Sequence, residues 1–154
     1  HLNTLLATAL AVLSFSAAAQ SGVQITDPWV RATVPQQKAT GAFMQITAPK
    51  AMRLLEVRSP VAGVAEIHEM SMTDNMMRMR QIKEIALPAG KAVELKPGGY
   101  HVMLLDLKGQ VKAGDKIALT LVLEGEDKHR ETIEVTAVAR PLGTASAPMP
   151  AMKH

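Results

Sequence analysis

The stretch "DKIALTLVLEGEDKHRETIEVTAVA" (residues 115–139) joins two runs in which apolar and polar side chains alternate. Both "ALTLVL" (118–123) and "TIEVTAV" (132–138) follow the two-residue period of a half-buried β-strand. The charged segment between them, "EGEDKHRE" (124–131), predicts a hairpin loop with His129 at its surface. This pattern indicates a β protein.

Similar short runs, separated by Gly, Pro, Asn and Asp, continue through most of the remaining chain. Seven to nine strands at this spacing predict an antiparallel β-sandwich, and no run suits a helix of about 12 residues or more after the first apolar segment. The predicted strands occupy residues 23–34 (in one or two pieces), 39–49, 52–60, 63–72, 76–87, 92–98, 100–107, 115–125 and 129–139.

The 154 residues suit one domain, with a signal peptide before it and a short tail after it. We predict that residues 1–19 form a secretory signal peptide, because an apolar stretch leads to a small-residue cleavage site after Ala19. That stretch is shorter than the roughly 20 residues of a membrane span, which favours a signal peptide over a transmembrane anchor. After its cleavage we expect no membrane insertion. No basic residue precedes it, and we expect that residues upstream of His1 were lost or replaced. Residues 20–141 form the predicted domain, and residues 142–154 a flexible tail.

The composition excludes several classes of function. The 17 Lys and Arg residues alternate with 14 Asp and Glu residues, which argues against nucleic-acid binding. The absence of cysteine removes thiol nucleophiles, disulfides and thiolate metal sites. No nucleophile, base and orienting group form a set, so we predict a protein that is not an enzyme. Five charged residues that could suggest catalysis are interpreted as solvated strand positions: Asp27, Arg31, Glu66, Glu69 and Asp106.

The segment "HEMSMTDNMMRMR" (68–80) holds five of the ten methionines and predicts a β-hairpin that turns at "TDN". A turn centred on Thr73 and Asp74 places His68 directly opposite Met79. A turn moved by one residue, onto Asp74 and the following Asn, shifts the pairing by two and keeps both side chains on one face. A three-residue loop would break this parity.

Further along, "YHVMLL" places His101 and Met103 on one face of a predicted strand. If the end of this strand lies beside the hairpin, two imidazoles and two thioethers converge. Such a soft, neutral set suits Cu(I), whereas a blue-copper centre would need a cysteine. Methionine is also common core filler, so local composition leaves metal binding and packing as equal alternatives. Four other methionines are interpreted as packing or supporting residues: Met70, Met72, Met76 and Met77.

A family resemblance decides between these alternatives. Two His and two Met residues have the H-x10-M-x21-H-x-M spacing of the periplasmic copper chaperones of the PCuAC type, namely His68, Met79, His101 and Met103. The similarity extends over about residues 23–140. It is carried by four flanking stretches, "ATGAFMQI" (39–46), "MRMR" (77–80), "LPAGK" (87–91) and "VELKPGGYHVMLLDLK" (93–108).

The resemblance implies a cupredoxin-like antiparallel β-sandwich with Greek-key connections. It also implies that these four side chains bind Cu(I) and that the protein delivers copper, in the periplasm, to the binuclear CuA site of cytochrome c oxidase. The implied partners are oxidase subunit II, through its CuA domain, and a Sco-type copper chaperone. We expect a monomer that binds no nucleic acid.

Some members of that family carry a Met- and His-rich C-terminal extension, which Met149, Met152 and His154 resemble in short form. We expect these residues to supply auxiliary ligands or a second copper site, with the imidazole and terminal carboxylate suited to Cu(II). Two other functions remain as alternatives: a periplasmic copper-buffering or copper-resistance protein, and an adhesive or structural sandwich without metal.

Overall fold

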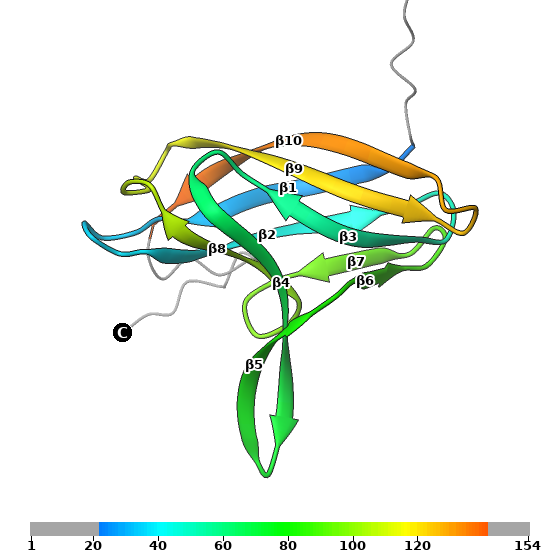
Figure 1. Ribbon diagram of the computed structural model, residues 1–154, viewed down its shortest axis with the longest axis horizontal. Coiled ribbons are helices and arrows are strands. Elements are labelled where there is room, and N and C mark those ends of the chain that lie inside the picture. Colours follow the sequence, from blue (N-terminus) through cyan, green and yellow to red (C-terminus); the bar gives the residue numbers. More distant parts are fainter. Residues whose placement is uncertain (1–21, 142–154) are drawn as a thin grey trace, which may run out of the picture.

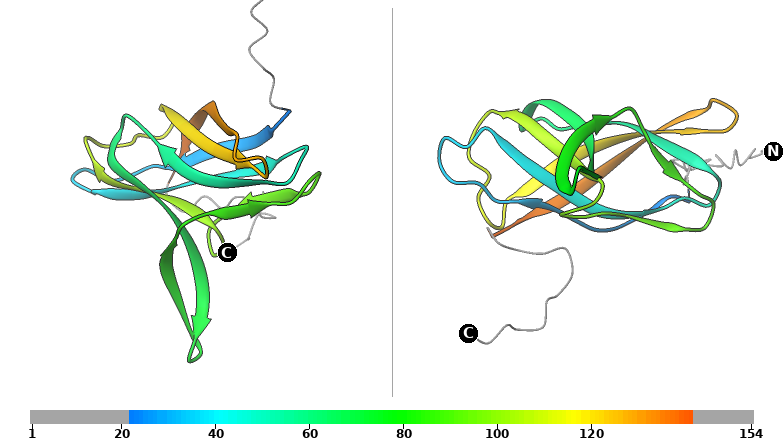
Figure 2. Two further views of the ribbon diagram at one scale, coloured as in Figure 1. Left: turned by 45° about the vertical axis from the view of Figure 1, so that its right-hand side comes forward. Right: turned by 90° about the horizontal axis from the view of Figure 1, so that it is seen from below.

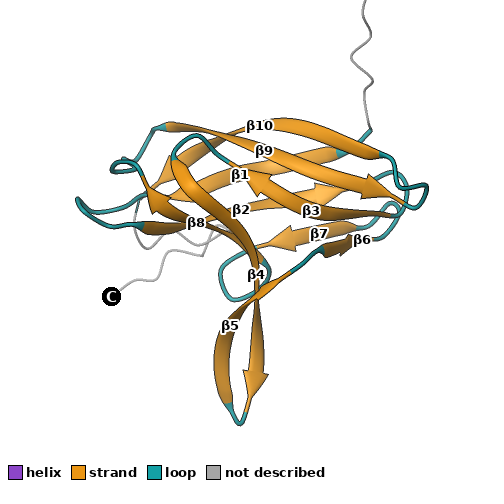
Figure 3. Ribbon diagram, in the orientation of Figure 1, coloured by secondary structure: helices purple, strands orange, loops and turns teal. Residues whose placement is uncertain are grey.

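The computed structural model describes residues 22–141, and this part of the chain consists of strands and loops without any helix (Figure 3). The predicted all-β fold is therefore confirmed. No helix long and apolar enough to cross a membrane is found in residues 22–141. The ten strands are β1 (Gln24–Arg31), β2 (Ala39–Thr47), β3 (Met52–Arg58), β4 (Ala62–Thr73), β5 (Met76–Ile82), β6 (Ile85–Leu87), β7 (Ala92–Leu95), β8 (His101–Leu107), β9 (Lys116–Gly125) and β10 (Arg130–Arg140).

The strands form one hydrogen-bonded sheet in the order β5-β4-β8-β2-β1-β10-β9-β3-β6, with β7 also pairing with β2. The sheet bends over itself, so that β10, β9 and β3 lie above β8, β2 and β7 (Figure 1). Alternate side chains of both layers meet in a single core, to which β9 contributes Leu119, Leu121 and Leu123, all fully buried. The alternation in the sequence thus marks the inward face correctly.

Two details differ from the predicted strands. Residues 76–87 form two strands, because β5 pairs with β4 whereas β6 pairs with β3. One strand pair, β1 with β10, is parallel, although the sequence predicts only antiparallel pairing. In β1 the register shifts between Thr26 and Trp29, where Asp27 has a positive φ of 51°. This bulge interrupts the regular pairing, so the segment that was predicted as one or two pieces is a single strand with an irregularity in its middle.

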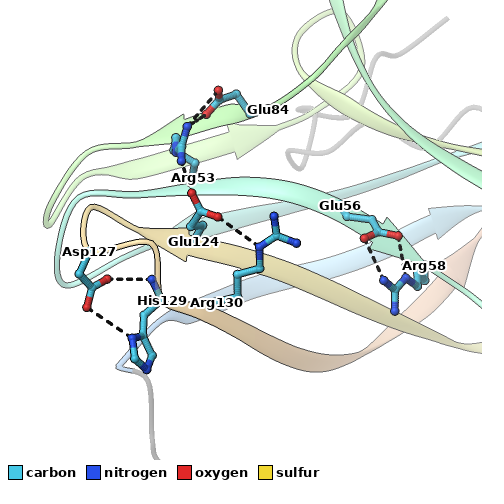
Figure 4. Close-up of polar contacts among 8 residues, drawn as sticks. All are labelled: Arg53, Glu56, Arg58, Glu84, Glu124, Asp127, His129 and Arg130. Atoms are coloured by element: carbon cyan, nitrogen blue, oxygen red, sulfur yellow. Dashed lines mark hydrogen bonds and ion pairs between the residues drawn. The ribbon is translucent and has the colours of Figure 1, made fainter.

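Charged side chains tie the strands of the upper layer together (Figure 4). The buried carboxylate of Glu124 on β9 accepts hydrogen bonds from Arg53 on β3 and from Arg130 on β10, with 3.2 Å between Arg130 Nε and Glu124 Oε2. Burial acts to raise the pKa of Glu124, but the hydrogen bond from Arg130 and the positive charges of Arg53, Arg130 and Lys128 lower this pKa below its usual value. The carboxylate is therefore ionised and paired.

The β4–β5 hairpin projects from the body of the sandwich (Figure 1), and a rotated view shows the same projection (Figure 2, left). The base of β4 pairs with β8, whereas the tip pairs only with β5. This hairpin carries all five methionines that the sequence places between residues 68 and 80.

Candidate metal centre

The hairpin turns at Asp74 and Asn75, whose φ angles are 51° and 62°. Two consecutive residues with positive φ form the type I′ turn that suits the twist of a two-residue β-hairpin, and Asp and Asn tolerate this conformation. The turn sets the register, so Met70 lies directly opposite Met79. His68 is two positions further from the tip and shares the face of Met79, as the second of the two predicted registers requires.

Strand β8 brings the second pair of predicted ligands to the same face. His101 lies directly opposite His68 in the antiparallel pairing of β4 with β8. Met103 lies opposite Glu66 in the same ladder. Because directly paired residues share a face, all four predicted ligands lie on one side of the sheet formed by β5, β4 and β8.

Three of the four side chains line one cleft of about 320 Å³, namely Met79, His101 and Met103, and Met70 lines it with them. His101 Nε2 is 2.9 Å from the sulfur of Met79. His68 lies beside this cleft, with its ring centroid 5.7 Å from that of His101. The structure therefore brings the four predicted residues together, with His68 slightly apart.

The orientation of His101 is fixed by a backbone contact. Its Nδ1 lies 2.9 Å from the carbonyl oxygen of Gly99 and donates a hydrogen bond to it, which leaves the lone pair on Nε2, the atom that faces Met79. Burial lowers the pKa of His101, the bond to Gly99 opposes this effect, and the nearby His68 and Arg31 lower the pKa further. The imidazole is thus kept neutral, as a metal ligand must be.

His68 is held by a carboxylate in the same strand. Its Nε2 lies 2.7 Å from Glu66 Oε2, and its side chain is only 13% exposed. Its Nδ1 is buried and has no hydrogen-bond partner within residues 22–141. When Nε2 donates to Glu66, Nδ1 carries a free lone pair. A buried polar atom without a partner is costly, and a metal ion would satisfy it.

The four predicted ligands at this face are soft and neutral, and the carboxylate of Glu66 on the same face is paired with His68. Within residues 22–141, no three His, Asp or Glu side chains are grouped so that they could hold a metal ion. Two imidazole nitrogens and two thioether sulfurs suit Cu(I). The residues present therefore fit a Cu(I) ion as cargo.

Several contributors were not identified from the sequence. Met70 was interpreted only as a packing or supporting residue, although an Asp-Asn turn places it opposite Met79. Glu66 was assigned to a solvated strand face, but its partner is His68. Gly41 and Phe43 also line the cleft; the Phe43 ring centroid lies 6.4 Å from that of His101, and a Cβ on Gly41 would approach Phe43 to 2.6 Å. The absence of a side chain at Gly41 therefore leaves the space that the Phe43 ring occupies.

The packing interpretation is wrong for the three methionines near the tip of the hairpin, which are each more than half exposed: Met72, Met76 and Met77. His129, predicted to lie at the surface of a charged loop, has a side chain that is 89% exposed. The predicted signal peptide (residues 1–19) lies outside the described residues. So do the three predicted auxiliary ligands of the tail, Met149, Met152 and His154.

The fold is shared with PCuAC domains. The chain is 25% identical to the apo PCuAC domain of PmoF2, with a TM-score of 0.61 over 81% of this chain and 94% of that domain. The chain is 27% identical to the copper-bound PCuAC domain of PmoF2, with a TM-score of 0.59 over 77% of this chain and 93% of that domain. It is 27% identical to the protein in the solution structure of CuI-DR1885 from Deinococcus radiodurans, with a TM-score of 0.54 over 80% of this chain and 83% of that chain.

The chain belongs to the family described as "Putative lipoprotein LpqE-like", whose model matches residues 23–138. It is 32% identical over 101 residues to the "Putative lipoprotein Lxx21020" of Leifsonia xyli subsp. xyli (strain CTCB07), a match that covers 65% of this chain. It is 28% identical over 123 residues to the "Uncharacterized protein RP573" of Rickettsia prowazekii (strain Madrid E). The chain spans 61% of the length of the first relative and 68% of the second.

Proposed function

We propose that this protein is a periplasmic copper chaperone, which binds Cu(I) through His68, Met79, His101 and Met103 and delivers it to the CuA site of cytochrome c oxidase. The observation that carries the proposal is the contact of His101 Nε2 with the Met79 sulfur, on the face that also holds His68 and Met103. The similarity to copper-bound PCuAC domains supports copper as the cargo.

The donor set explains how copper could be both held and released. Thioethers have no proton to lose and form no disulfides, so they remain ligands for Cu(I) in an oxidising compartment. Met79 is 49% exposed, whereas His101 is 6% exposed. A partner can therefore approach the thioether side first and replace ligands one at a time while the imidazole still holds the ion.

The predicted signal peptide and the description of the family as lipoprotein-like support export to the cell envelope. We propose the periplasm as the location, with the CuA domain of oxidase subunit II and a Sco-type copper chaperone as partners. The protein acts by binding and transfer, not catalysis, and it does so as a monomer. The alternative is a periplasmic protein that buffers copper or confers copper resistance.

The binding step is tested by titrating the mature protein with Cu(I) against a competing chelator. We expect one tightly bound Cu(I). We expect Met79→Leu and His101→Ala each to weaken the affinity by roughly 100-fold or more, since changes to residues that only support ligands already cost about 10–100-fold. His129→Ala is the matched control, because it removes an exposed imidazole from another loop. Parental affinity in both site variants would refute the assignment.

The delivery step needs a separate experiment. Cu(I)-loaded protein is mixed with an apo CuA domain of oxidase subunit II, with and without a Sco-type protein, and the copper content of each is measured after separation. Transfer on mixing supports the chaperone. Copper that stays on this protein, when the CuA domain binds copper more tightly, supports the buffering function instead.

The tail is a further part of the proposal. We expect Met149, Met152 and His154 to bind Cu(II) or a second copper ion. Truncation after Pro141 should therefore reduce the stoichiometry in a Cu(II) titration and leave the first Cu(I) in place. Equal stoichiometry and affinity of both forms, in both oxidation states, would eliminate a role of the tail.

A further inference from the structure

One face of the β4–β5 hairpin carries a row of methionines that leads outward from the candidate metal centre. Met70 pairs directly with Met79, and one step nearer the tip Met72 pairs directly with Met77. All four share the face of His68, because residues two apart in a strand point to the same side. Directly paired residues have Cβ atoms about 4.5–5.5 Å apart, so the two flexible thioethers of a pair can reach one ion.

The opposite face of the hairpin has a different composition. Arg80 forms an ion pair with Glu69, with 2.6 Å between Arg80 Nη2 and Glu69 Oε1. Of the methionines in the hairpin, Met76 alone lies on this second face, opposite Thr73. Between Glu69 and Arg80 the other side chains of this face are polar or charged, namely Glu69, Ser71, Thr73, Arg78 and Arg80, whereas Ile67 and Ile82 pair on it at the base of the hairpin. The thioethers are therefore sorted onto the face of the metal centre.

These methionines do not serve the core. Met72 is 64% exposed and Met77 is 51% exposed, on a hairpin that projects from the sandwich (Figure 2). Four of the eight large apolar side chains that are exposed within residues 22–141 are methionines of this hairpin. Exposed apolar side chains gathered in one place mark a binding surface. Here each carries a sulfur donor at its end.

We propose that Met72 and Met77, with the half-buried Met70, form a second, outer Cu(I) site that loads the inner one. Two residues along a strand span about 7 Å, so an ion on the outer pair is one step from the Met70–Met79 pair. Copper moves by ligand exchange, in which one Cu–S bond forms as another breaks. The ion remains Cu(I), and no proton or electron is released. The loading role rests on the proposed inner site, but copper binding at the outer pair does not.

The outer site lacks imidazole, so it binds Cu(I) more weakly than the inner site and independently of pH in the range where histidine titrates. This order of affinity directs copper inward. The outer pair is also the most exposed part of the row, which makes it the first thioether donor that an incoming copper carrier meets.

Binding is tested on the mature protein labelled with [13C-methyl]methionine, titrated anaerobically with Cu(I) in acetonitrile. We expect the first equivalent to shift the methyl signals of Met79 and Met103. The second equivalent should shift those of Met72, Met77 and Met70. Met76 is the internal control, because it is 57% exposed but lies on the other face. Signals of Met72 and Met77 that stay in place, or that move only together with Met76, would overturn the outer site.

Loading is tested by stopped-flow transfer from a Cu(I)–bicinchoninate complex. A Met72→Leu/Met77→Leu double variant should lose the second equivalent and load the inner site about tenfold more slowly, a change of about 1.4 kcal/mol in the barrier, at unchanged final affinity. Met76→Leu should load at the parental rate. Equal rates in the double variant and the parent would refute the loading role. If instead Met79 and Met103 do not respond to the first equivalent, the proposed inner site fails, and the outer signals are still read separately.

Discussion

The β4–β5 and β9–β10 hairpins are both long and antiparallel, but they differ in how far their side chains are buried and in which side chains they expose. In β9–β10 the inward side chains are buried in the core and the loop carries exposed polar side chains such as Asp127 and His129. In β5 no side chain is fully buried, and the tip carries thioethers. The β9–β10 hairpin supplies side chains of the core, and the β4–β5 hairpin supplies the candidate metal donors. Exposed residues of β5 and of the hairpin tip can therefore change with little effect on folding, whereas Ala62 and Ile67 of β4 belong to the core.

The largest expected difference between the hairpins is in stability. Leu121→Ala removes a fully buried side chain of β9 and should lower the free energy of unfolding by about 2–5 kcal/mol. Met77→Ala, on the exposed hairpin, should change it by no more than about 0.5 kcal/mol. Urea unfolding of both apo variants measures the two effects. A comparable loss in Met77→Ala would show that the donor hairpin is part of the cooperative core.

The next effect concerns the carboxylate that orients His68. Glu66→Ala should weaken Cu(I) affinity by about 10–100-fold, because Nε2 of His68 loses its hydrogen-bond partner. Glu69→Ala is the matched control: its side chain is 22% exposed, against 25% for Glu66, but it lies on the other face. Chelator competition measures both. An equal loss in the two variants would point to general electrostatics instead of orientation.

A smaller effect is expected from pH. Since burial lowers the pKa of His101, a proton competes with Cu(I) at this residue only below the usual imidazole value of about 6.5. Affinity should therefore hold from about pH 7.5 to 6.5, fall as the pH drops further, and remain partial because thioethers are not protonated. His129→Ala should leave this profile unchanged. Affinity that does not respond down to about pH 5 would argue against imidazole ligation.

The smallest effect is expected in the charged loop of β9–β10. His129 Nδ1 is 3.8 Å from Asp127 Oδ2, and both side chains are mostly exposed, so the pair contributes little. Asp127→Ala should leave the unfolding midpoint and the Cu(I) stoichiometry unchanged within error, as measured by thermal unfolding and titration. A loss of copper binding in this variant would contradict the conclusion that the β4–β5 hairpin, and not β9–β10, supplies the copper ligands.

The sequence predicts the β9–β10 hairpin well, because strict alternation over a buried face fixes both period and orientation. It also predicts that His68 and Met79 share a face, since either two-residue turn preserves parity. The choice of register depends on Asp74 and Asn75 both adopting positive φ, which the sequence allows without requiring. Local pattern could not show that His68 lies opposite His101, because that pairing joins strands distant in sequence. The family resemblance implied that the four side chains share one copper site, but not this direct pairing.

Methionine was the weakest point of the sequence interpretation. It fills cores and binds soft metals equally well, so composition alone could not tell that Met72 and Met77 are exposed. The split of residues 76–87 into β5 and β6 was missed for a related reason. Apolar residues stand on both sides of Lys83 and Glu84, so the sequence reads as one strand. The strand is divided there because the pairing partner changes from β4 to β3.

The parallel pairing of β1 with β10 bears on how fast this protein can fold. Trp29 must find Val138 near the other end of the domain before the sheet is complete. Contacts between such distant segments make folding slow, on the order of milliseconds to seconds for all-β domains. The sheet cannot close until the last strand has emerged from the ribosome. Slow closure of the sheet would suit the export that we propose, because a chain that is still unfolded passes through a narrow channel more readily than a folded domain.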